Sequence, residues 1–330
     1  MTMDGIIAID KPAGLTSAQV VATVKRATRA AKVGHTGTLD PFATGVLVCC
    51  LNRATRLASF FLHGDKGYEG EMLLGVETDT QDPTGRVIRQ VEDVSVSDAA
   101  IEEAFSRYRG VISQEPPVYS ALKHEGVPLY KLARAGTPVQ KPARTVTIHE
   151  LSVKRIDLPR VSFFTRCSGG TYVRALVSDI GRDLGVGAHL ASLRRTENSG
   201  FTLNDAISLE ELSRLVADGQ LHTRVTGMNA ALRFMPQVRA DAALTQAVMT
   251  GRKLTRQDLP GEAGAMTGNI KITDEAGRLL AVISADPEGT FFSYSCVLVG
   301  PDAAAADRKR RFNHSETRNQ KEARQSGSHP

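Results

Sequence analysis

Residues 34–41 read Gly-His-Thr-Gly-Thr-Leu-Asp-Pro, and two glycines and a proline among eight positions disfavour both a helix and a strand. This composition predicts a shaped loop. An apolar, strand-like run follows from Val46 to Cys50. Upstream, Thr16 and Gln19 fit a helix-capping box. Because functional side chains concentrate in loops held by rigid elements, residues 34–41 are the first candidate for a functional site.

Helices and strands are mixed along the rest of the chain without a regular βαβ repeat, which favours the α+β class. Strand-like patterns occupy residues 5–9, 46–50, 68–76, 145–153, 269–273, 278–283 and 294–299. Helical spacing or capping residues predict helices over 97–108, 171–184 and 242–249, and two more that begin after Thr16 and at Ser208. After about Leu232 the segments are short and separated by glycine, so we expect a small β-rich domain there.

Targeting signals are missing from the sequence. No run of about 18 apolar residues exists, which argues against a membrane-spanning helix. Asp4 and Asp10 stand where a secretory signal needs an apolar stretch. We therefore expect a cytoplasmic protein.

The cysteines and the net charge narrow the function only a little. Four cysteines lack paired spacing, so we expect reduced thiols rather than a zinc site or a disulfide framework. A net charge of +5 is compatible with a polyanionic partner and also with an ordinary enzyme. Residues 301–330 contain Arg308-Lys309-Arg310-Arg311 and almost no large apolar residue, which predicts disorder. This tail is either simply solvated or adds electrostatic affinity for RNA.

Several short motifs resemble those of the TruB pseudouridine synthases, in the order of that family. The resemblance covers roughly residues 5–300, with one departure at Asn52, where many relatives have a glycine. Asn tolerates left-handed backbone geometry, so we expect little effect. The matching motifs are 10–17 (Asp-Lys-Pro-Ala-Gly-Leu-Thr-Ser), 34–41, 66–68 (Lys-Gly-Tyr), 116–123 (Pro-Pro-Val-Tyr-Ser-Ala-Leu-Lys), 168–174 (Ser-Gly-Gly-Thr-Tyr-Val-Arg) and 193–196 (Leu-Arg-Arg-Thr).

The resemblance implies a catalytic domain over residues 1–231 with a mixed, mainly antiparallel sheet. It also implies a PUA-like RNA-binding domain over 232–300, leaving 301–330 as the tail. The implied activity is isomerisation of the T-loop uridine of tRNA, at position 55, to pseudouridine. This reaction has no net redox change and transfers no external group, so we expect no cofactor and no metal. The resemblance further implies tRNA as the partner, no obligatory protein partner and a monomer.

The resemblance implies three catalytic residues: Asp40 as the nucleophile, Arg174 as its ion-pair partner and Tyr68 as the residue that stacks on the uracil. An arginine neighbour lowers the pKa of a carboxylate. Each residue also has an ordinary alternative. Asp40 with Pro41 could merely initiate a turn, Arg174 could lie on the surface, and Tyr68 could be a core aromatic of a strand.

Four further residues are implied to bind the substrate. His35 would stack into the disrupted T-loop, Leu193 would wall the uracil pocket, and Tyr172 belongs to the same motif as Arg174. From the residues alone, His35 could be an ordinary loop histidine and Leu193 a core leucine. Lys11 would either contact a phosphate or buttress the Asp40 loop. Seven basic residues are candidates for tracking the phosphate backbone: Lys25, Arg26, Arg29, Lys141, Arg144, Arg194 and Arg195.

Three rival functions remain at this point. One is a non-catalytic RNA-binding protein with this fold, which the complete set of Asp40, Tyr68 and Arg174 argues against. Another is the guide-RNA-dependent branch of the same superfamily, which works within a multiprotein particle. A glycoside hydrolase would need a second carboxylate placed as a general acid, and no carboxylate is marked for that role.

Overall fold

A computed structural model describes residues 3–261, 264, 266–286 and 290–299. The chain forms two compact units, the first ending at Thr226 and the second beginning at Gly227. The domain boundary expected from the sequence, between residues 231 and 232, lies five positions further on than this division. The predicted disordered tail, 301–330, lies outside the described residues.

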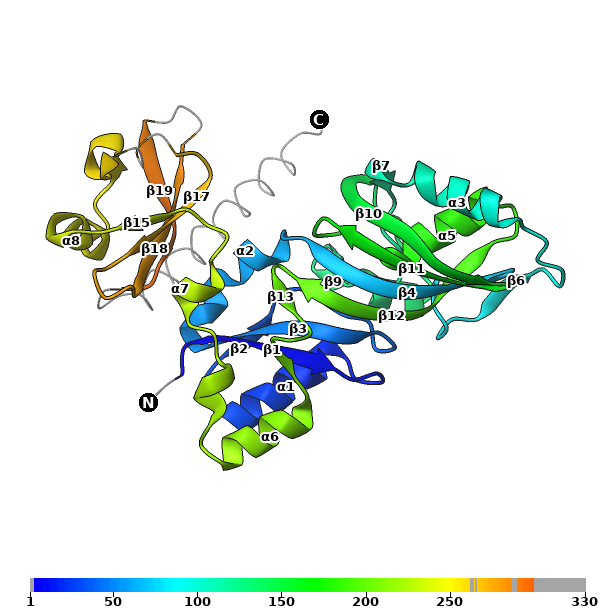
Figure 1. Cartoon of the computed structure of the whole chain (residues 1–330), viewed down its shortest axis with the longest axis horizontal. Helices are drawn as coiled ribbons and strands as arrows, with labels where there is room; N and C mark the ends of the chain where they lie inside the picture. Colours follow the sequence, from blue (N-terminus) through cyan, green and yellow to red (C-terminus); the bar gives the residue numbers. More distant parts are fainter. Residues whose placement is uncertain (1–2, 262–263, 265, 287–289, 300–330) are drawn as a thin grey trace, which may run out of the picture. The chain divides into compact units, whose positions relative to one another are not determined.

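The first unit is built on a ten-stranded sheet (Figure 1). Its strands are β1 (Gly5–Lys11), β2 (Val33–His35), β3 (Thr44–Leu51), β4 (Lys66–Leu74), β7 (Gly110–Gln114), β10 (Arg144–Asp157), β11 (Arg160–Cys167), β12 (Ala188–Asn198), β13 (Phe201–Thr202) and β14 (Ala206–Ile207). Eight of them follow the order β14-β1-β3-β12-β4-β11-β10-β7, with β2 beside β3 and β13 beside β12. The pairs β1–β14 and β3–β12 are parallel and the other pairs are antiparallel. The predicted mixed, mainly antiparallel sheet is confirmed.

Helices pack on the two halves of this sheet (Figure 1). The helices of the first unit are α1 (Ser17–Thr28), α2 (Ala58–Leu62), α3 (Asp98–Arg107), α4 (Leu129–Arg134), α5 (Val173–Asp183) and α6 (Leu209–Ala217), with short 3-10 helices η1 (Asn52–Leu57) and η2 (Leu221–Arg224). One hydrophobic core joins α1 and α6 to β1 and β3. Another joins α3 and α5 to β4, β10, β11 and β12. The sheet therefore holds two cores, one on each half.

Local sequence signals explain where these helices begin. The predicted capping box of α1 is present, since the Thr16 hydroxyl accepts from the backbone of Gln19 and the Gln19 side chain binds back to Thr16. Ser97 caps α3 and Ser208 caps α6 in the same way through their hydroxyls. Asn52 has a φ of 50°, so the left-handed geometry anticipated at this departure from the family pattern occurs.

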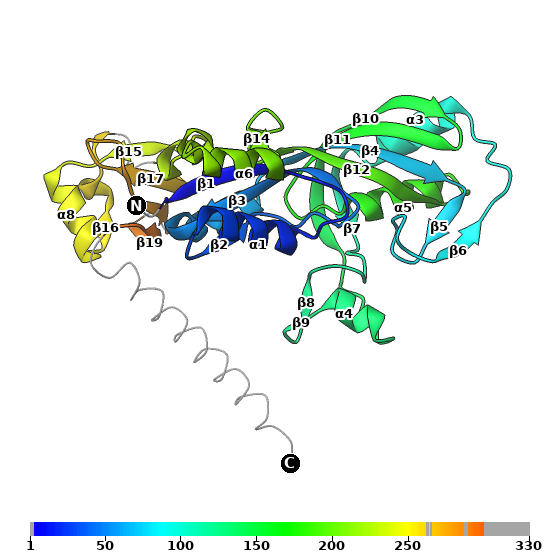
Figure 2. The same cartoon turned by 90° about the horizontal axis from the view of Figure 1, so that it is seen from below.

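Two short excursions leave the main sheet. The strands β5 (Val76–Thr78) and β6 (Val87–Gln90) form one hairpin, whose connecting loop is 79–86. The strands β8 (Lys123–His124) and β9 (Val127–Pro128) form the other, and Figure 2 shows them with α4 standing away from the sheet.

The second unit is a small β-rich domain, as expected. A five-stranded sheet has the order β15-β17-β18-β19-β16. Its core gathers buried residues from these strands and from one helix. The fold is consistent with the PUA-like domain implied by the sequence. Its elements are α7 (Met228–Ala231), β15 (Gln237–Arg239), α8 (Ala242–Thr250), β16 (Leu254–Thr255), η3 (Arg256–Asp258), β17 (Asn269–Thr273), β18 (Leu279–Ala285) and β19 (Phe291–Val297).

One glycine is required where β3 meets β12. Gly45 has a φ of 102°, and a Cβ atom added there would overlap the backbone of Arg195 on the neighbouring strand. Gly219, just past α6, has a similar sign of φ, at 68°, but has open space around it. A substitution at Gly219 therefore adds backbone strain alone, whereas a substitution at Gly45 adds both strain and steric overlap.

We expect Gly45→Ala to lower the free energy of unfolding by more than about 4 kcal/mol, because strain and overlap act together. Gly219→Ala should cost only about 1 kcal/mol, from strain alone. Urea unfolding followed by circular dichroism measures both. Equal losses in the two variants would contradict the close approach at Gly45.

Candidate active site

The loop between β2 and β3 carries Asp40 and is held at many points. The Ser17 hydroxyl at the start of α1 donates to the Leu39 carbonyl at 3.0 Å and accepts from the Leu39 amide at 2.8 Å. The Gly14 amide donates to the Pro41 carbonyl at 2.8 Å. These bonds tie both neighbours of Asp40 to the segment that precedes α1 and to its first turn.

Lys11 at the end of β1 is fully buried and also supports this loop. Its Nζ donates to the carbonyls of Pro12, Leu15 and Pro41, at 2.9, 2.7 and 3.2 Å. Burial lowers the pKa of Lys11 to about 8, although Asp40 opposes that shift. Of the two alternatives for Lys11, this geometry favours a buttress of the Asp40 loop over a phosphate contact.

Arg195 is a correction to the sequence analysis, which placed it among the residues that track phosphate. It is 1% exposed. Its guanidinium donates to the carbonyls of Val46, Gly37 and Thr38. The reason lies in strand geometry, because alternate residues of β12 face opposite sides and Arg194 takes the more open one. Arg194 instead pairs with Asp10 at 2.7 Å.

The other basic candidates divide by exposure. Lys25, Arg26 and Arg29 are exposed around the end of α1 and remain candidates for phosphate contacts. Lys141 lies 3.1 Å from Nδ1 of His124, beside the β8–β9 hairpin.

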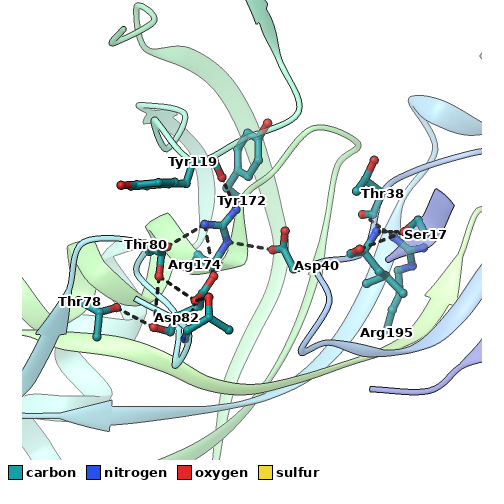
Figure 3. Close-up of polar contacts among 12 residues, drawn as sticks. Ser17, Thr38, Asp40, Thr78, Thr80, Asp82, Tyr119, Tyr172, Arg174 and Arg195 are labelled. Carbon is teal, nitrogen blue, oxygen red and sulfur yellow. Dashed lines mark hydrogen bonds and ion pairs between the residues drawn. The ribbon is translucent and has the colours of Figure 1, made fainter. Parts of the chain in front are cut away.

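Asp40 meets Arg174, which lies in the first turn of α5 as predicted (Figure 3). The Nε atom of Arg174 is 2.9 Å from Oδ2 of Asp40. The Arg174 side chain is 4% exposed, whereas that of Asp40 is 34% exposed. The ion pair thus has a buried cation and a carboxylate that is open to an approaching molecule.

A second carboxylate, Asp82, shares Arg174. Its Oδ2 is 3.6 Å from Nη1 of Arg174, and its side chain is 8% exposed. Its Oδ1 accepts from the Thr80 hydroxyl, the Thr84 amide and the Thr84 hydroxyl, at 2.7, 2.9 and 2.6 Å. Asp82 is therefore a fixed, hydrogen-bonded counter-ion, unlike Asp40.

Backbone carbonyls complete the surroundings of Arg174. Nη1 donates to Thr80 at 2.7 Å and Nη2 donates to Tyr119 at 2.9 Å. Figure 3 shows these contacts on one side of the guanidinium and Asp40 on the other. All three nitrogens thus have polar neighbours, which suits the planar fork of arginine.

Burial raises the pKa of Asp40, and the nearby Asp82 charge raises it further. The ion pair with Arg174 acts in the opposite direction, as the sequence analysis expected, but it does not outweigh burial. The carboxylate is therefore more basic than an ordinary aspartate.

Tyr68 and Leu193 lie on neighbouring strands near Asp40. Tyr68 on β4 is 7% exposed and Leu193 on β12 is 8% exposed, and both belong to the core of this half of the sheet. Burial raises the pKa of Tyr68, with a smaller contribution from Asp40, so its phenol stays neutral at neutral pH. Their placement fits either a core role or the wall of a pocket.

His35 and Tyr172 come from the edges of the site. Nδ1 of His35 accepts from the Gly37 amide at 3.3 Å, and burial lowers the pKa of His35, which favours a neutral ring. Tyr172 precedes α5, and its backbone exchanges two hydrogen bonds with the Gln114 side chain. The Arg144 guanidinium stacks on the Tyr172 ring, 4.9 Å from its centroid.

Four residues that hold this arrangement together are not marked by the sequence patterns: Ser17, Asp82, Tyr119 and Gln114. Ser17 and Tyr119 both lie in motifs that resemble the family, but the contribution of Tyr119 is a carbonyl, which no side-chain pattern reveals. Asp82 stands before Pro83 and near Gly85, and a carboxylate in such a turn is usually read as a turn former.

Among the described residues, no three His, Cys, Asp or Glu side chains gather as a metal site requires. All four cysteines are buried thiols outside any disulfide. Within the same part of the chain, no helix has the length and apolar character to cross a membrane.

Comparison with protein families gives two adjacent matches. Residues 25–173 match the model of the TruB family pseudouridylate synthase N-terminal domain. Residues 174–233 match the model of the tRNA pseudouridylate synthase B C-terminal domain.

Curated relatives match over most of the chain. The tRNA pseudouridine synthase B of Burkholderia mallei (strain NCTC 10247) is 42% identical over 299 residues, which cover 90% of this chain and 98% of the relative. The protein of the same name from Geotalea uraniireducens (strain Rf4) is 47% identical over 233 residues, covering 71% and 75% of the two chains.

Solved structures share the fold as well. A chain in the crystal structure of a Cbf5–Nop10–Gar1 complex has a TM-score of 0.72 and 27% identity, covering 90% of this chain and 86% of that one. A chain in an H/ACA RNP bound to a substrate RNA containing 2′-deoxyuridine has a TM-score of 0.69 and 26% identity, covering 91% and 86%. The fold and these matches define an RNA-modifying isomerase, a pseudouridine synthase. More narrowly, the chain belongs to the TruB family.

The electrostatics of the site predict how Asp40 titrates. Asp82→Asn should lower the pKa of Asp40, because removing a neighbouring negative charge makes the ionised form of Asp40 less unfavourable. Asp79→Asn, in the same loop but paired with Arg86, should leave that pKa unchanged. Carbon NMR of the aspartate carboxyl groups follows both titrations. A rise in the pKa of Asp40 in the Asp82 variant would contradict the arrangement.

Proposed function

We propose that this protein isomerises the T-loop uridine of tRNA, position 55, to pseudouridine, with Asp40 as the nucleophile. The observation that carries the proposal is the Asp40–Arg174 ion pair, in which a partly exposed carboxylate stands against a buried cation. Membership of the TruB family and the names of its relatives support tRNA as the substrate. We further propose that the second unit is an RNA-binding domain and that the enzyme works alone as a cytoplasmic monomer.

The reaction needs a carboxylate but no redox partner. The N1–C1′ bond of uridine breaks, the uracil turns, and C5 bonds to C1′. The C5 proton leaves to solvent and N1 takes up a proton, so the atoms balance without a co-reactant. Asp40 serves this sequence by forming a transient bond either to C1′ or to the uracil ring, and both routes require its ionised form.

Arg174 keeps Asp82 as a counter-ion throughout these reaction steps. When Asp40 forms a covalent bond it loses its negative charge, and a buried arginine without a counter-ion is costly. Asp82 stays beside Arg174, held by its three hydrogen bonds. Asp82 therefore limits the penalty of discharging Asp40.

Four residues are assigned to the RNA. The uridine has to leave its stack before Asp40 can reach it, at a cost of about a few kcal/mol. We assign Tyr68 to stacking on the flipped uracil and Leu193 to the wall of its pocket. The neutral Tyr68 phenol suits relay of the C5 proton. We assign His35 to the gap left in the T-loop and Tyr172 to the rim of the site.

The guide-RNA-dependent alternative retains one supporting observation, because the solved relatives include a Cbf5–Nop10–Gar1 complex. Against it stands the higher identity to curated tRNA pseudouridine synthases B, at 42–47%. Turnover of naked tRNA by the purified chain, without added proteins or guide RNA, separates the two functions.

Asp40→Asn should abolish turnover and leave tRNA binding intact, because the amide cannot act as a nucleophile and Arg174 still has Asp82 beside it. The measurement is tritium release from a T-arm hairpin labelled at uracil C5, with no cofactor added, together with filter binding of tRNA. The unaltered protein is the control.

The two proteins distinguish the functions. Release by the unaltered protein alone supports the isomerase and its essential carboxylate. Release by Asp40→Asn at the normal rate would remove Asp40 as nucleophile. Binding without release from either protein would favour the non-catalytic or guide-dependent functions.

Arg174→Lys should lower kcat about 100-fold with little change in tRNA affinity, since displacement of a reacting group by about 1 Å has effects of this size. A lysine ammonium cannot reach Asp40, Asp82 and two carbonyls on separate sides. Single-turnover rates with saturating enzyme measure the change. An unchanged rate would show that the planar fork is dispensable.

A further inference from the structure

Arg195 binds the Asp40 loop on both sides of the nucleophile. Before Asp40, Nη2 donates to the Gly37 carbonyl at 3.1 Å and Nη1 to the Thr38 carbonyl at 3.5 Å. After Asp40, Nε donates to the Val46 carbonyl at 2.7 Å. A single planar group therefore joins the start of the loop to β3, the strand that follows it.

The charge of Arg195 has no carboxylate partner. Its residue is 1% exposed, and within the described residues no ion pair joins it to an aspartate or glutamate. A buried cation is costly to keep when only neutral carbonyls surround it. Hydrogen bonds to these carbonyls offset this cost, and an apolar side chain would leave those carbonyls without this donor. The charge and the fork therefore point to a use beyond packing.

The same guanidinium reaches the strand that carries Tyr68. Tyr68 and Arg195 are register partners on β4 and β12, and the Arg195 charge acts against burial by lowering the pKa of Tyr68. Cross-strand partners of this kind share one face of a sheet. The charge of Arg195 contributes to the pKa shifts of titratable groups on four strands, which are Lys11, His35, Cys49, Lys66 and Tyr68.

Leu193 lies two residues before Arg195 on the same strand, so it points to the same face. Directly after Arg195 the pairing of β12 with β4 shifts register. Such irregularities re-aim side chains next to active sites. Arg195 thus stands where the nucleophile loop, Tyr68 and Leu193 converge.

We propose that Arg195 is a positioning residue for the isomerisation: its guanidinium ties the start of the Asp40 loop and the following strand β3 to β12, beside Tyr68, and so sets the distance from the Asp40 carboxylate to the uracil pocket. This inference rests on the proposed function. It assigns Arg195 no contact with RNA, because its side chain is enclosed by the loop.

The test compares Arg195→Met and Arg195→Lys with a matched control, Lys66→Met. Lys66 is also a buried cation bound only to carbonyls, those of Phe61, Leu62 and Gly64, which lie outside the Asp40 loop. Three quantities are measured for each variant: the single-turnover rate of pseudouridine formation with saturating enzyme, the Kd for tRNA, and the urea midpoint of unfolding.

We expect Arg195→Met to slow the single-turnover rate about 100-fold with an unchanged Kd, because the carboxylate loses its fixed position. Arg195→Lys keeps the charge and part of the carbonyl contacts, so it should recover about tenfold of that loss. Lys66→Met should lower the urea midpoint and keep the normal rate.

Two results would overturn the inference. One is a normal rate in either Arg195 variant. The other is a loss of rate in all three variants in proportion to their loss of stability, which would reduce Arg195 to a structural residue. If Arg195→Met fails to fold, the rate of Arg195→Lys decides by the same criterion. Absence of pseudouridine from the unaltered protein would instead refute the proposed function, so the two failures are distinguishable.

Discussion

A carboxylate on a loop can act as a nucleophile only if the loop has a fixed conformation. In this protein, buried cations that bind backbone carbonyls fix the conformation of the Asp40 loop. Lys11 holds the carbonyl of Pro41, directly after Asp40, and Arg195 holds Gly37, Thr38 and Val46. Each cation is removed from water, so its hydrogen bonds to carbonyls are strong and their loss would be expensive. The shape of the 34–41 segment therefore depends on residues far away in the chain.

The two carboxylates beside Arg174 differ in burial, and this difference gives them different roles. Asp82 has its Oδ1 filled by three donors and is nearly enclosed, whereas Asp40 keeps a third of its side chain exposed. Both carboxylates contact Arg174, yet only Asp40 is exposed enough to move out of the ion pair and react with a substrate. Burial and the charge of Asp82 make Asp40 more basic than usual, while its exposed third keeps it accessible, a combination that suits a nucleophile.

Sequence patterns predicted the parts of the site that are local. The capped helix after Thr16, the place of Arg174 in the first turn of α5 and most of the loop at 34–41 follow from short-range signals, but Gly34 and His35 pair with β3 as part of β2. Arg195 was assigned wrongly because its partner Gly37 lies 158 positions away, and no local pattern reports such a contact. The alternation of side chains along β12 is the one sequence signal for this placement, since it puts Arg195 on the same face of the strand as Leu193. The net direction of the Asp40 shift also required the fold, because burial competes with the ion pair.

The parallel contact of β3 with β12, in the middle of the large sheet, has only two residue pairs in register, against seven for β1 with β3. The Asp40 loop is shared between the two halves of the sheet: Lys11 and Ser17 bind it from the half built on α1 and α6, whereas Leu39 and Ala43 pack in the core of α3 and α5 with Tyr68 and Leu193. Neither half holds a complete site. Activity consequently requires both halves of the sheet. A molecule that has formed only one half during folding, or has lost one half through local unfolding, keeps a hydrophobic core but lacks a complete active site.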